Sequence, residues 1–450
     1  MRYFPLTPGE RREMLEFIGV KDVKELFSDL PGDKSFHDLS DLPAGLDEKS
    51  LLRKFSAYAG RNRHGDYLSF LGAGAYQHFI PEVVNSLTQR GEFVTPYTPY
   101  QPEVSQGSLQ AVFEYQTMMT MLTGMDVANS SLYDGGTAAV EALLMAARKK
   151  GGRRRMVLAA SLHPEYREII ETYLQNFDFE LVEALLDPAD GRIDTADLAG
   201  KINQDTIAVL FQSPNFFGVV EEAGRLTELA HAAGAYAIQV VTEAMSLPFL
   251  QPPGKYGVDV VVGEAQSFGL PLSFGGPYLG FMAAAGEFLR QLPGRLVGQT
   301  VDRDGKRGYV LTLSTREQHI KREKATSNIC SNQALCAVRA AVYLAAMGPQ
   351  GLHQVASANH RNTCYFVESV TALPGVSVRY PRNFFNEVVL DLKQGNALEL
   401  LSKIQERCIL AGIPLQWFHE HEKSAFLLNF TEMHEKEDID RLVAALGELT

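Results

Sequence analysis

The sequence predicts an α/β protein with a mixed, mostly parallel, doubly wound sheet in a large domain and a smaller C-terminal α+β domain. Apolar runs typical of buried strands, at 156–160, 207–211 and 235–241, alternate with amphipathic helices. Another apolar run at 258–262 leads into a glycine-rich loop, as expected at the end of a buried strand. After residue 376 strands and helices continue in a different order, which indicates a second unit.

The totals are those of an ordinary soluble globular protein. The chain has 450 residues, of which 45% are apolar and 21% charged, and its length suggests two domains with an appended segment. The net charge of −12 argues against a nucleic-acid partner, and no apolar run reaches the roughly 18 residues of a membrane span. The amino terminus lacks the apolar core of a signal peptide, so we expect a cytoplasmic protein.

The cysteines and histidines show no disulfide or metal pattern. The four cysteines form no CxxC pair and are expected to be reduced thiols; they are Cys330, Cys336, Cys364 and Cys408. The run His419–Glu422 has ligand-type side chains, but adjacent positions of a strand face opposite sides. We therefore expect a polar loop there and no metal site.

We expect three regions, an N-terminal helical arm, a large domain, and a linking helix with the small domain, at residues 1–60, 61–330 and 331–450. In the arm, Thr7 and Glu10 form a capping-box pattern around Pro8. Two further helical stretches are expected near 22–30 and 51–58. Two interpretations stay open: the arm wraps a partner subunit, or it is a simple extension.

Residues 61–107 are rich in glycine, proline and tyrosine and have little periodicity. Prolines at 96, 99 and 102 favour extended backbone and exclude a regular helix. Long irregular stretches inside enzymes are usually functional or disordered, and the aromatic content argues against disorder. We expect a functional segment.

From residue 108 the order of elements follows from periodicity and from glycine stops. Apolar spacing predicts a helix that ends at Gly124, a second helix from Asp134 to Gly151, and further helices between the strands. A polar segment after the glycine-rich loop precedes a long helix from about Leu335. The small domain is expected to contain strand, strand, helix, strand and helix, at 376–380, 385–392, 397–411, 425–430 and from 436.

This layout matches fold-type I enzymes that use pyridoxal phosphate (PLP), and several residues fall where such enzymes hold the cofactor. Gly136 and Thr137 open a helix, where backbone N–H groups can bind a phosphate. His163 takes the position of the ring that stacks on PLP, and Asn215 that of the partner of its phenolic oxygen. Each has a plainer alternative: a capped helix start, a structural histidine and a turn residue.

Glu243 and Gln266 occupy the two most demanding positions. Glu243 replaces the aspartate that pairs with the pyridinium nitrogen, and its extra methylene shifts the carboxylate by about 1.5 Å. The stretch VDVVVGEAQSFGLPLSFGGPYLGF resembles the lysine-bearing loop of glycine decarboxylase, the P-protein of the glycine cleavage system. Matching Phe268, Pro271 and the run Gly275–Pro277 places Gln266 at the Schiff-base lysine, and an amide cannot form that bond.

No other lysine is placed to substitute for the missing one. Lys255 precedes the strand, and Lys321 and Lys324 lie in a charged run. None follows a strand at the cofactor crevice. We therefore expect no covalently bound cofactor on this chain.

Longer runs resemble the amino-terminal half of the P-protein family over almost the whole chain. They are FLGAGAYQHFIPEVV, TPYTPYQPEVSQG, FEYQTMMTMLTG, LYDGGTAAVEA, LHPEYRE and STREQHIKREKATSNICSNQAL. The lysine-bearing half does not follow Thr450, so we expect the alpha subunit of the form that is split into two polypeptides.

The resemblance implies an enzyme subunit that is inactive alone. The implied partner is a lysine-bearing beta subunit that holds PLP, in an α2β2 assembly. The assembly decarboxylates glycine and passes the aminomethyl group to the lipoyl arm of H-protein. The alternatives are a non-catalytic scaffold or regulator that retains the fold, and an independent PLP enzyme, against which Gln266 argues.

Tyr97 and Tyr100, with Gln101 and Ser105, are candidates to complete the partner's active site. In fold-type I dimers that site lies at the subunit interface, and tyrosine hydroxyls can donate to the carboxylate of glycine. The alternative is that both tyrosines pack in the core of the large domain.

The run Lys149–Arg155 is the strong basic cluster of the sequence. We expect a solvated turn between a helix and a strand. The alternative is a docking patch for an acidic carrier protein.

Overall fold

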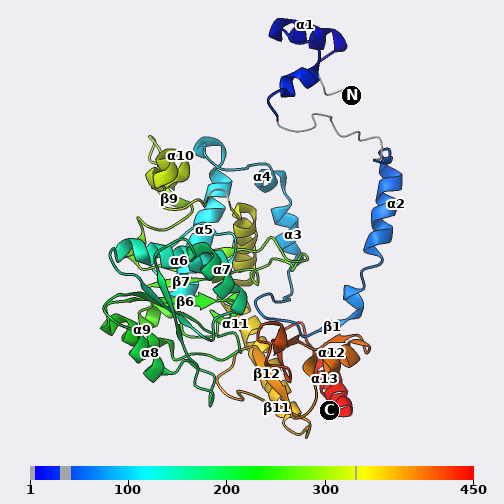
Figure 1. The fold of residues 1–450 in the computed structure, drawn as a ribbon, viewed down its shortest axis with the longest axis vertical. Helices are drawn as coiled ribbons and strands as arrows, with labels where there is room; N and C mark the ends of the chain where they lie inside the picture. Colours follow the sequence, from blue (N-terminus) through cyan, green and yellow to red (C-terminus); the bar gives the residue numbers. More distant parts are fainter. Residues whose placement is uncertain (1–5, 31–41, 330–331) are drawn as a thin grey trace. The chain divides into compact units, whose positions relative to one another are not determined.

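The computed structural model describes residues 6–30, 42–329 and 332–450 (Figure 1). The chain divides into two units, Met1–His64 and Gly65–Thr450, which are described separately. The expected division of the second unit near residue 330 stays a proposal. Free thiols in the described part are Cys336, Cys364 and Cys408, and Cys330 lies outside it. No helix within the described ranges is long and apolar enough to cross a membrane.

The described part of the first unit contains helical pieces only: α1 (Pro8–Ile18), the 3-10 helix η1 (Val23–Phe27) and α2 (Glu48–Ala59). The capping box expected at Thr7 and Glu10 is confirmed. No residue of the three pieces is buried, and Phe17 and Phe55 are 94% and 60% exposed. Isolated helices of 11 and 12 residues are marginal in water, so these helices lack the packing that normally stabilises them.

The second unit is built on a seven-stranded sheet in the order β2-β8-β7-β6-β5-β3-β4. Its strands are β2 (Val127–Ala128), β3 (Arg155–Ala159), β4 (Glu180–Ala184), β5 (Thr206–Gln212), β6 (Tyr236–Val241), β7 (Val260–Glu264) and β8 (Gly280–Ala284). Neighbours from β4 to β7 pair in parallel, whereas β8 runs antiparallel to β7 and β2. This confirms the mixed, mostly parallel sheet. The sequence does not predict β4, because this edge strand is only partly apolar.

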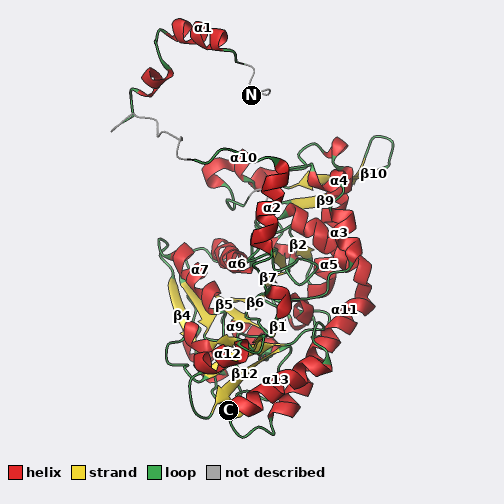
Figure 2. Cartoon of the chain, turned by 90° about the vertical axis from the view of Figure 1, so that its right-hand side faces the viewer, coloured by secondary structure: helices red, strands yellow, loops and turns green. Residues whose placement is uncertain are grey.

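Helices cover both faces of the sheet, as a doubly wound order predicts; Figure 2 shows the strands in yellow among the red helices. On one face α6 (Gly135–Lys149) and α7 (Pro164–Leu174) pack on Met156 and Leu158. On the other face Val157 and Val209 meet α5 (Gln106–Thr123), α8 (Thr195–Lys201), α9 (Ala223–Ala232) and the first part of α11 (Ala334–Val370). Alternate residues of each strand therefore belong to two separate cores.

The small domain is an antiparallel sheet in the order β11-β12-β15-β14, with bounds Val376–Val378, Glu387–Leu392, Ala425–Asn429 and Ile413–Pro414. It packs against α12 (Ala397–Gln405), α13 (Lys436–Leu449) and the second part of α11, which breaks at Gly348 ahead of Pro349. The helix expected over 397–411 ends at Gln405. The chain turns there through Cys408, whose φ is 59°, into β13 (Ile409–Leu410).

The sequence does not predict two further features. The polar segment after β8 contains an antiparallel hairpin, β9 (Leu296–Val301) and β10 (Arg307–Thr312), followed by the short helix α10 (Gln318–Lys321). The irregular region 61–107 contains β1 (Leu68–Ser69), α3 (Glu82–Thr88) and α4 (Gly91–Val94). Because β1 pairs in parallel with β13 of the small domain, the segment after β1 leaves that domain and leads to α3.

Candidate functional site

The carboxyl ends of the parallel strands form the edge at which folds of this kind bind their ligands. His163 follows β3, Asn215 follows β5, Glu243 follows β6 and Gln266 follows β7. All four residues are buried, none more than 3% exposed. The strand order thus brings four of the sequence-predicted positions to one edge of the sheet.

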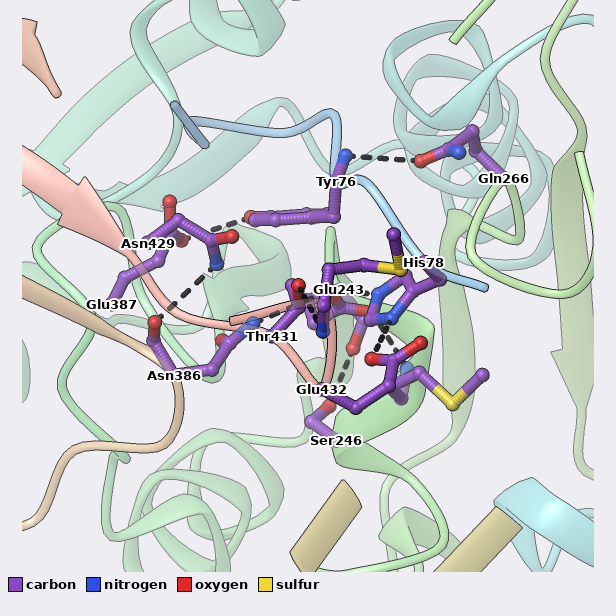
Figure 3. A network of polar contacts seen from close by, with 12 residues as sticks. Tyr76, His78, Glu243, Ser246, Gln266, Asn386, Glu387, Asn429, Thr431 and Glu432 are labelled. Atoms are coloured by element: carbon purple, nitrogen blue, oxygen red, sulfur yellow. Dashed lines mark hydrogen bonds and ion pairs between the residues drawn. The ribbon is translucent and has the colours of Figure 1, made fainter. Parts of the chain in front are cut away.

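A segment of the chain itself lies at this edge. Residues 73–78, here called the crevice segment, run between β1 and α3 and contact three of the four side chains. Figure 3 shows the contacts of Tyr76 with Gln266 and of His78 with Glu243. The contacts are His163 Nε2 to Ala73 O at 2.9 Å, Tyr76 N to Gln266 Oε1 at 3.0 Å, and His78 Nε2 to Glu243 Oε2 at 3.1 Å. The positions expected to touch a cofactor therefore touch the protein's own chain.

Gln266 is bonded at both ends of its amide. Its Oε1 accepts the Tyr76 backbone N–H at 3.0 Å, and its Nε2 donates to the Leu270 carbonyl at 2.7 Å. A buried amide whose oxygen and nitrogen both have hydrogen-bond partners avoids the free-energy cost of an unsatisfied polar group. Glutamine thus serves here as a structural link between the crevice segment and the loop after β7.

Glu243 is one of two carboxylates that enclose the buried imidazole of His78. Besides His78, its oxygens accept from the Met245 N–H at 2.8 Å and from Asn386 Nδ2 at 3.4 Å. On the other side, His78 Nδ1 lies 2.8 Å from Glu432 Oε2. Burial alone lowers the pKa of His78, but the charge of Glu243 and the hydrogen bonds to both glutamates outweigh it and raise this pKa to about 10. His78 is therefore a cation at neutral pH, and it lies between the carboxyl groups of Glu243 and Glu432.

Tyr76 and Glu387 join the crevice segment to the small domain. The Tyr76 hydroxyl donates to Glu387 Oε2 at 2.9 Å, and the Ala73 N–H donates to Glu387 Oε1 at 2.7 Å. Burial raises the pKa of Glu387 to about 7, although both hydrogen bonds lower it. With the link from His78 to Glu432, the segment is bonded to the large domain on one side and to the small domain on the other.

Two glycines allow the segment to pass this closely. A Cβ at Gly72 would lie 2.3 Å from Glu387 Oε1 and 2.6 Å from Asn429 Cβ. Gly74 has a φ of +98°, and a Cβ there would lie 3.1 Å from His163 Nε2. Only glycine combines that backbone angle with that approach.

The side chains of His163 and Asn215 are both hydrogen-bonded to other parts of the chain. His163 Nδ1 accepts the Glu165 N–H at 3.2 Å, so its proton lies on Nε2, which donates to Ala73 O; burial lowers its pKa. Asn215 Nδ2 donates to Glu221 Oε1 at 2.8 Å, and its Oδ1 accepts the Phe217 N–H at 3.0 Å. Both side chains are therefore committed to local structure.

The helix start at Gly136 and Thr137 is capped by its own chain. The Thr137 N–H donates to Asp134 Oδ1 at 2.7 Å, which completes a capping box. The Gly135 N–H donates to Glu264 Oε2 at 3.1 Å, and burial raises the pKa of Glu264 to about 8. Two of the N–H groups that a phosphate would need are thus already used.

These residues do not fit covalently bound PLP. Gln266 offers no amine, Glu243 faces a histidine cation in place of a pyridinium nitrogen, and the imidazole of His163 is bonded to the crevice segment. Among the described residues, no group of three His, Cys, Asp or Glu side chains is placed to hold a metal ion. The contacts of Gln266, Glu243 and His163 are with other parts of the same chain.

The proline-stiffened loop presents a different surface. Tyr97 is 83% exposed and Tyr100 is 51% exposed, so neither packs in the core as the alternative required. Tyr100, Gln101 and Ser105 line a cavity of ≈ 820 Å³, together with Glu92 and Ser108. The loop therefore offers hydroxyl and amide groups to a molecule from outside.

The basic cluster Lys149–Arg155 is largely neutralised by nearby residues. Lys149 Nζ lies 2.7 Å from Glu287, and Arg155 Nη2 lies 2.9 Å from Glu180. Arg154 pairs with Asp178. The geometry favours the solvated turn over a docking patch.

Sequence reasoning missed Tyr76, His78 and Glu264. The spaced glycines in FLGAGAYQHF indicate that the backbone passes close to another part of the chain, but they do not indicate which part. The partners Glu387 and Glu432 lie 311 and 354 positions further along the chain, beyond the reach of local patterns.

Comparisons with known proteins agree over the full length. The family model described as glycine cleavage system P-protein matches residues 1–446. The probable glycine dehydrogenase (decarboxylating) subunit 1 of Desulforamulus reducens is 46% identical over 100% of both chains, and that of Moorella thermoacetica is 48% identical over 99% of both. A crystal structure of glycine decarboxylase (P-protein) in inhibitor-bound form has a TM-score of 0.88 and 41% identity, and the match covers 100% of both chains.

A more distant likeness concerns the fold alone. The sphingosine-1-phosphate lyase of Burkholderia pseudomallei has a TM-score of 0.67 at 16% identity, over 92% of both chains. The doubly wound fold with a small second domain is thus shared beyond the close relatives. From the family match and the full-length relatives, this chain belongs to the glycine cleavage system P-protein family.

Proposed function

We propose that this chain is subunit 1, the alpha subunit, of a glycine dehydrogenase (decarboxylating) built from two kinds of polypeptide. The observation that carries the proposal is the closed crevice: Gln266, which the resemblance places at the lysine position, is hydrogen-bonded to the crevice segment. A chain of this family with that crevice needs a second chain to hold PLP. The proposed partner is the lysine-bearing beta subunit, in an α2β2 assembly in the cytoplasm.

The proposed assembly decarboxylates glycine and passes the aminomethyl group to the lipoyl arm of H-protein. PLP, bound by the partner, supplies the electron acceptor for decarboxylation. The contribution of this chain is the surface around Tyr97 and Tyr100, with Gln101 and Ser105. Their hydroxyl and amide groups suit the recognition of the carboxylate of glycine at a subunit interface.

The full-length likeness to proteins named as enzyme subunits favours this function over the non-catalytic scaffold or regulator. The exposed, hydroxyl-lined cavity supports the same choice, because a scaffold has no need of it.

The test is co-expression with the lysine-bearing subunit and an assay of glycine–bicarbonate exchange. We expect exchange from the mixture and none from either subunit alone. Equal exchange from the lysine-bearing subunit without this chain would contradict the proposal.

A further inference from the structure

The Tyr100 side chain is contacted by a guanidinium. Arg295 Nη2 donates to the Tyr100 hydroxyl oxygen at 2.9 Å, and Arg295 Cζ lies 5.1 Å from the centroid of the tyrosine ring. Tyr100 is half exposed, whereas Arg295 is only 6% exposed. The contact thus joins a surface tyrosine to a buried charge.

Arg295 is itself fixed in place. Its Nε lies 3.4 Å from Glu317 Oε2, and both side chains are 7% exposed. Its backbone carbonyl accepts the Ser130 N–H at 3.0 Å, and the Arg316 guanidinium donates to the Gly294 carbonyl at 2.9 Å. A buried cation held by a carboxylate and by its own backbone is a rigid donor.

The side chain of His319 also restrains Tyr100. The imidazole lies edge-on to the phenol ring, with centroids 5.7 Å apart. His319 Nδ1 lies 3.7 Å from Glu317 Oε2, the oxygen that pairs with Arg295. Glu317 thus links the two groups that contact Tyr100.

The chemistry of the contact sets the direction of the tyrosine proton. A guanidinium has only donors, so the Tyr100 oxygen must act as the acceptor toward Arg295. The single hydroxyl proton is then directed away from Arg295. A hydroxyl that accepts from a cation is also a stronger donor, because successive hydrogen bonds polarise one another. Tyr100 also lines the ≈ 820 Å³ cavity, the side to which the proposal below assigns the acceptor of this proton.

We propose that Arg295 is a positioning residue that holds Tyr100 as a donor toward the carboxylate of the substrate in the partner's active site. The inference rests on the proposed function, in which this loop completes that site. It adds a specific role for a buried residue of the hairpin β9–β10 region, and it predicts that Arg295 acts through Tyr100.

The test is a double-mutant cycle in the assembled two-subunit enzyme, with Tyr100→Phe, Arg295→Gln and both together. Glycine–bicarbonate exchange gives kcat and KM for glycine. We expect Tyr100→Phe to lower kcat/KM roughly 10- to 100-fold, as for a lost hydrogen bond to a charged group, mainly by raising KM. Arg295→Gln alone should lower kcat/KM by a similar factor. Added to Tyr100→Phe, it should lower kcat/KM by less than about 2-fold more.

Tyr97→Phe provides the matched control, because it is a tyrosine of the same loop and is 83% exposed. Arg295→Gln should lower kcat/KM by the same factor with or without this change. Co-elution with the lysine-bearing subunit checks assembly of every variant. Arg295→Lys keeps a charge opposite Glu317 and carries the same cycle if the glutamine variant does not assemble.

The outcomes separate the two proposals. Unchanged kinetics of Tyr100→Phe would remove Tyr100 from the active site and so contradict the proposed role of the loop. A large effect of Tyr100→Phe on kcat/KM would support the proposed role of the loop. If Arg295→Gln then lowers kcat/KM by the same factor with and without Tyr100→Phe, the positioning role of Arg295 is overturned.

Discussion

The backbone N–H of Tyr76 donates to Oε1 of Gln266 at 3.0 Å. This bond joins the crevice segment to the position at which the resemblance places a Schiff-base lysine. The other end of the amide donates to the Leu270 carbonyl at 2.7 Å. Gln266 therefore does more than replace a reactive lysine with an unreactive amide. Its two hydrogen bonds hold the crevice segment against the loop after β7.

Restoring the lysine alone should not restore the cofactor. In Gln266→Lys the crevice segment still occupies the space, and Glu243 still faces His78. The variant also loses the acceptor for the buried Tyr76 N–H, at a cost of roughly 1–3 kcal/mol in the free energy of unfolding. After incubation with PLP and dialysis we expect no cofactor absorbance. The lysine-bearing subunit, treated in parallel, is the positive control. Stable PLP uptake by the variant would show that the segment moves aside.

The ion pair of His78 should make stability depend on pH in a defined window. The folded-state pKa, about 10, lies above the unfolded value of 6.5. The ion pair of His78 therefore stabilises the folded chain fully below pH 6.5, and this stabilisation is lost as the pH rises toward 10.

The measurement is the free energy of unfolding of the wild type and of His78→Asn across this range. The raised pKa values of Glu221, Glu264 and Glu387 act in the same direction in both proteins, so the difference reports the ion pair of His78 together with its carboxylate partners. We expect the difference to shrink steadily above pH 6.5. A difference that stays constant up to pH 10 would mean that His78 is neutral in the folded chain.

Gly72 should not tolerate a side chain. Alanine there would place Cβ 2.3 Å from Glu387 Oε1 and 2.6 Å from Asn429 Cβ, so the segment must shift. We expect a loss of about 1–3 kcal/mol or more in unfolding experiments with denaturant. Gly151→Ala is the control, because no atom lies within 4 Å of a Cβ at that position. Equal stability of the two variants would argue against the close packing of the segment.

The exposed helices of the arm should matter for assembly more than for the fold of the chain. Phe55 is 60% exposed on α2, so Phe55→Ser should change the unfolding of the isolated chain by less than about 0.5 kcal/mol. If the arm wraps the partner, the same change should weaken association measured by sedimentation of the mixed subunits. Unchanged association would favour the simple extension.

The fold could be predicted from the sequence wherever the signal is local. Thr7 and Glu10 form the expected capping box, and Gly124 ends α5 in a left-handed conformation. The central strands β3, β5, β6 and β7 are buried apolar runs, which the sequence pattern predicts directly. The edge strand β4 and the hairpin β9–β10 were not predicted, because their residues are only partly buried and so form no continuous apolar run.

The site was predictable only in part. The sequence pattern predicted that Glu243 and Gln266 follow the ends of two buried strands, β6 and β7. It did not predict which side chains or backbone groups each of them contacts. The bond of Tyr76 to Gln266 spans 190 positions, and that of His78 to Glu243 spans 165. Such pairings depend on the tertiary fold, which no periodicity encodes.

The most direct test of the central claim is to locate PLP in the assembled enzyme. Borohydride reduction of the two-subunit complex, followed by mass spectrometry of each polypeptide, shows which lysines carried the cofactor. We expect the reduced adduct on the partner subunit only, with none on this chain. An adduct on a lysine of this chain, in stoichiometric amount, would contradict the closed crevice.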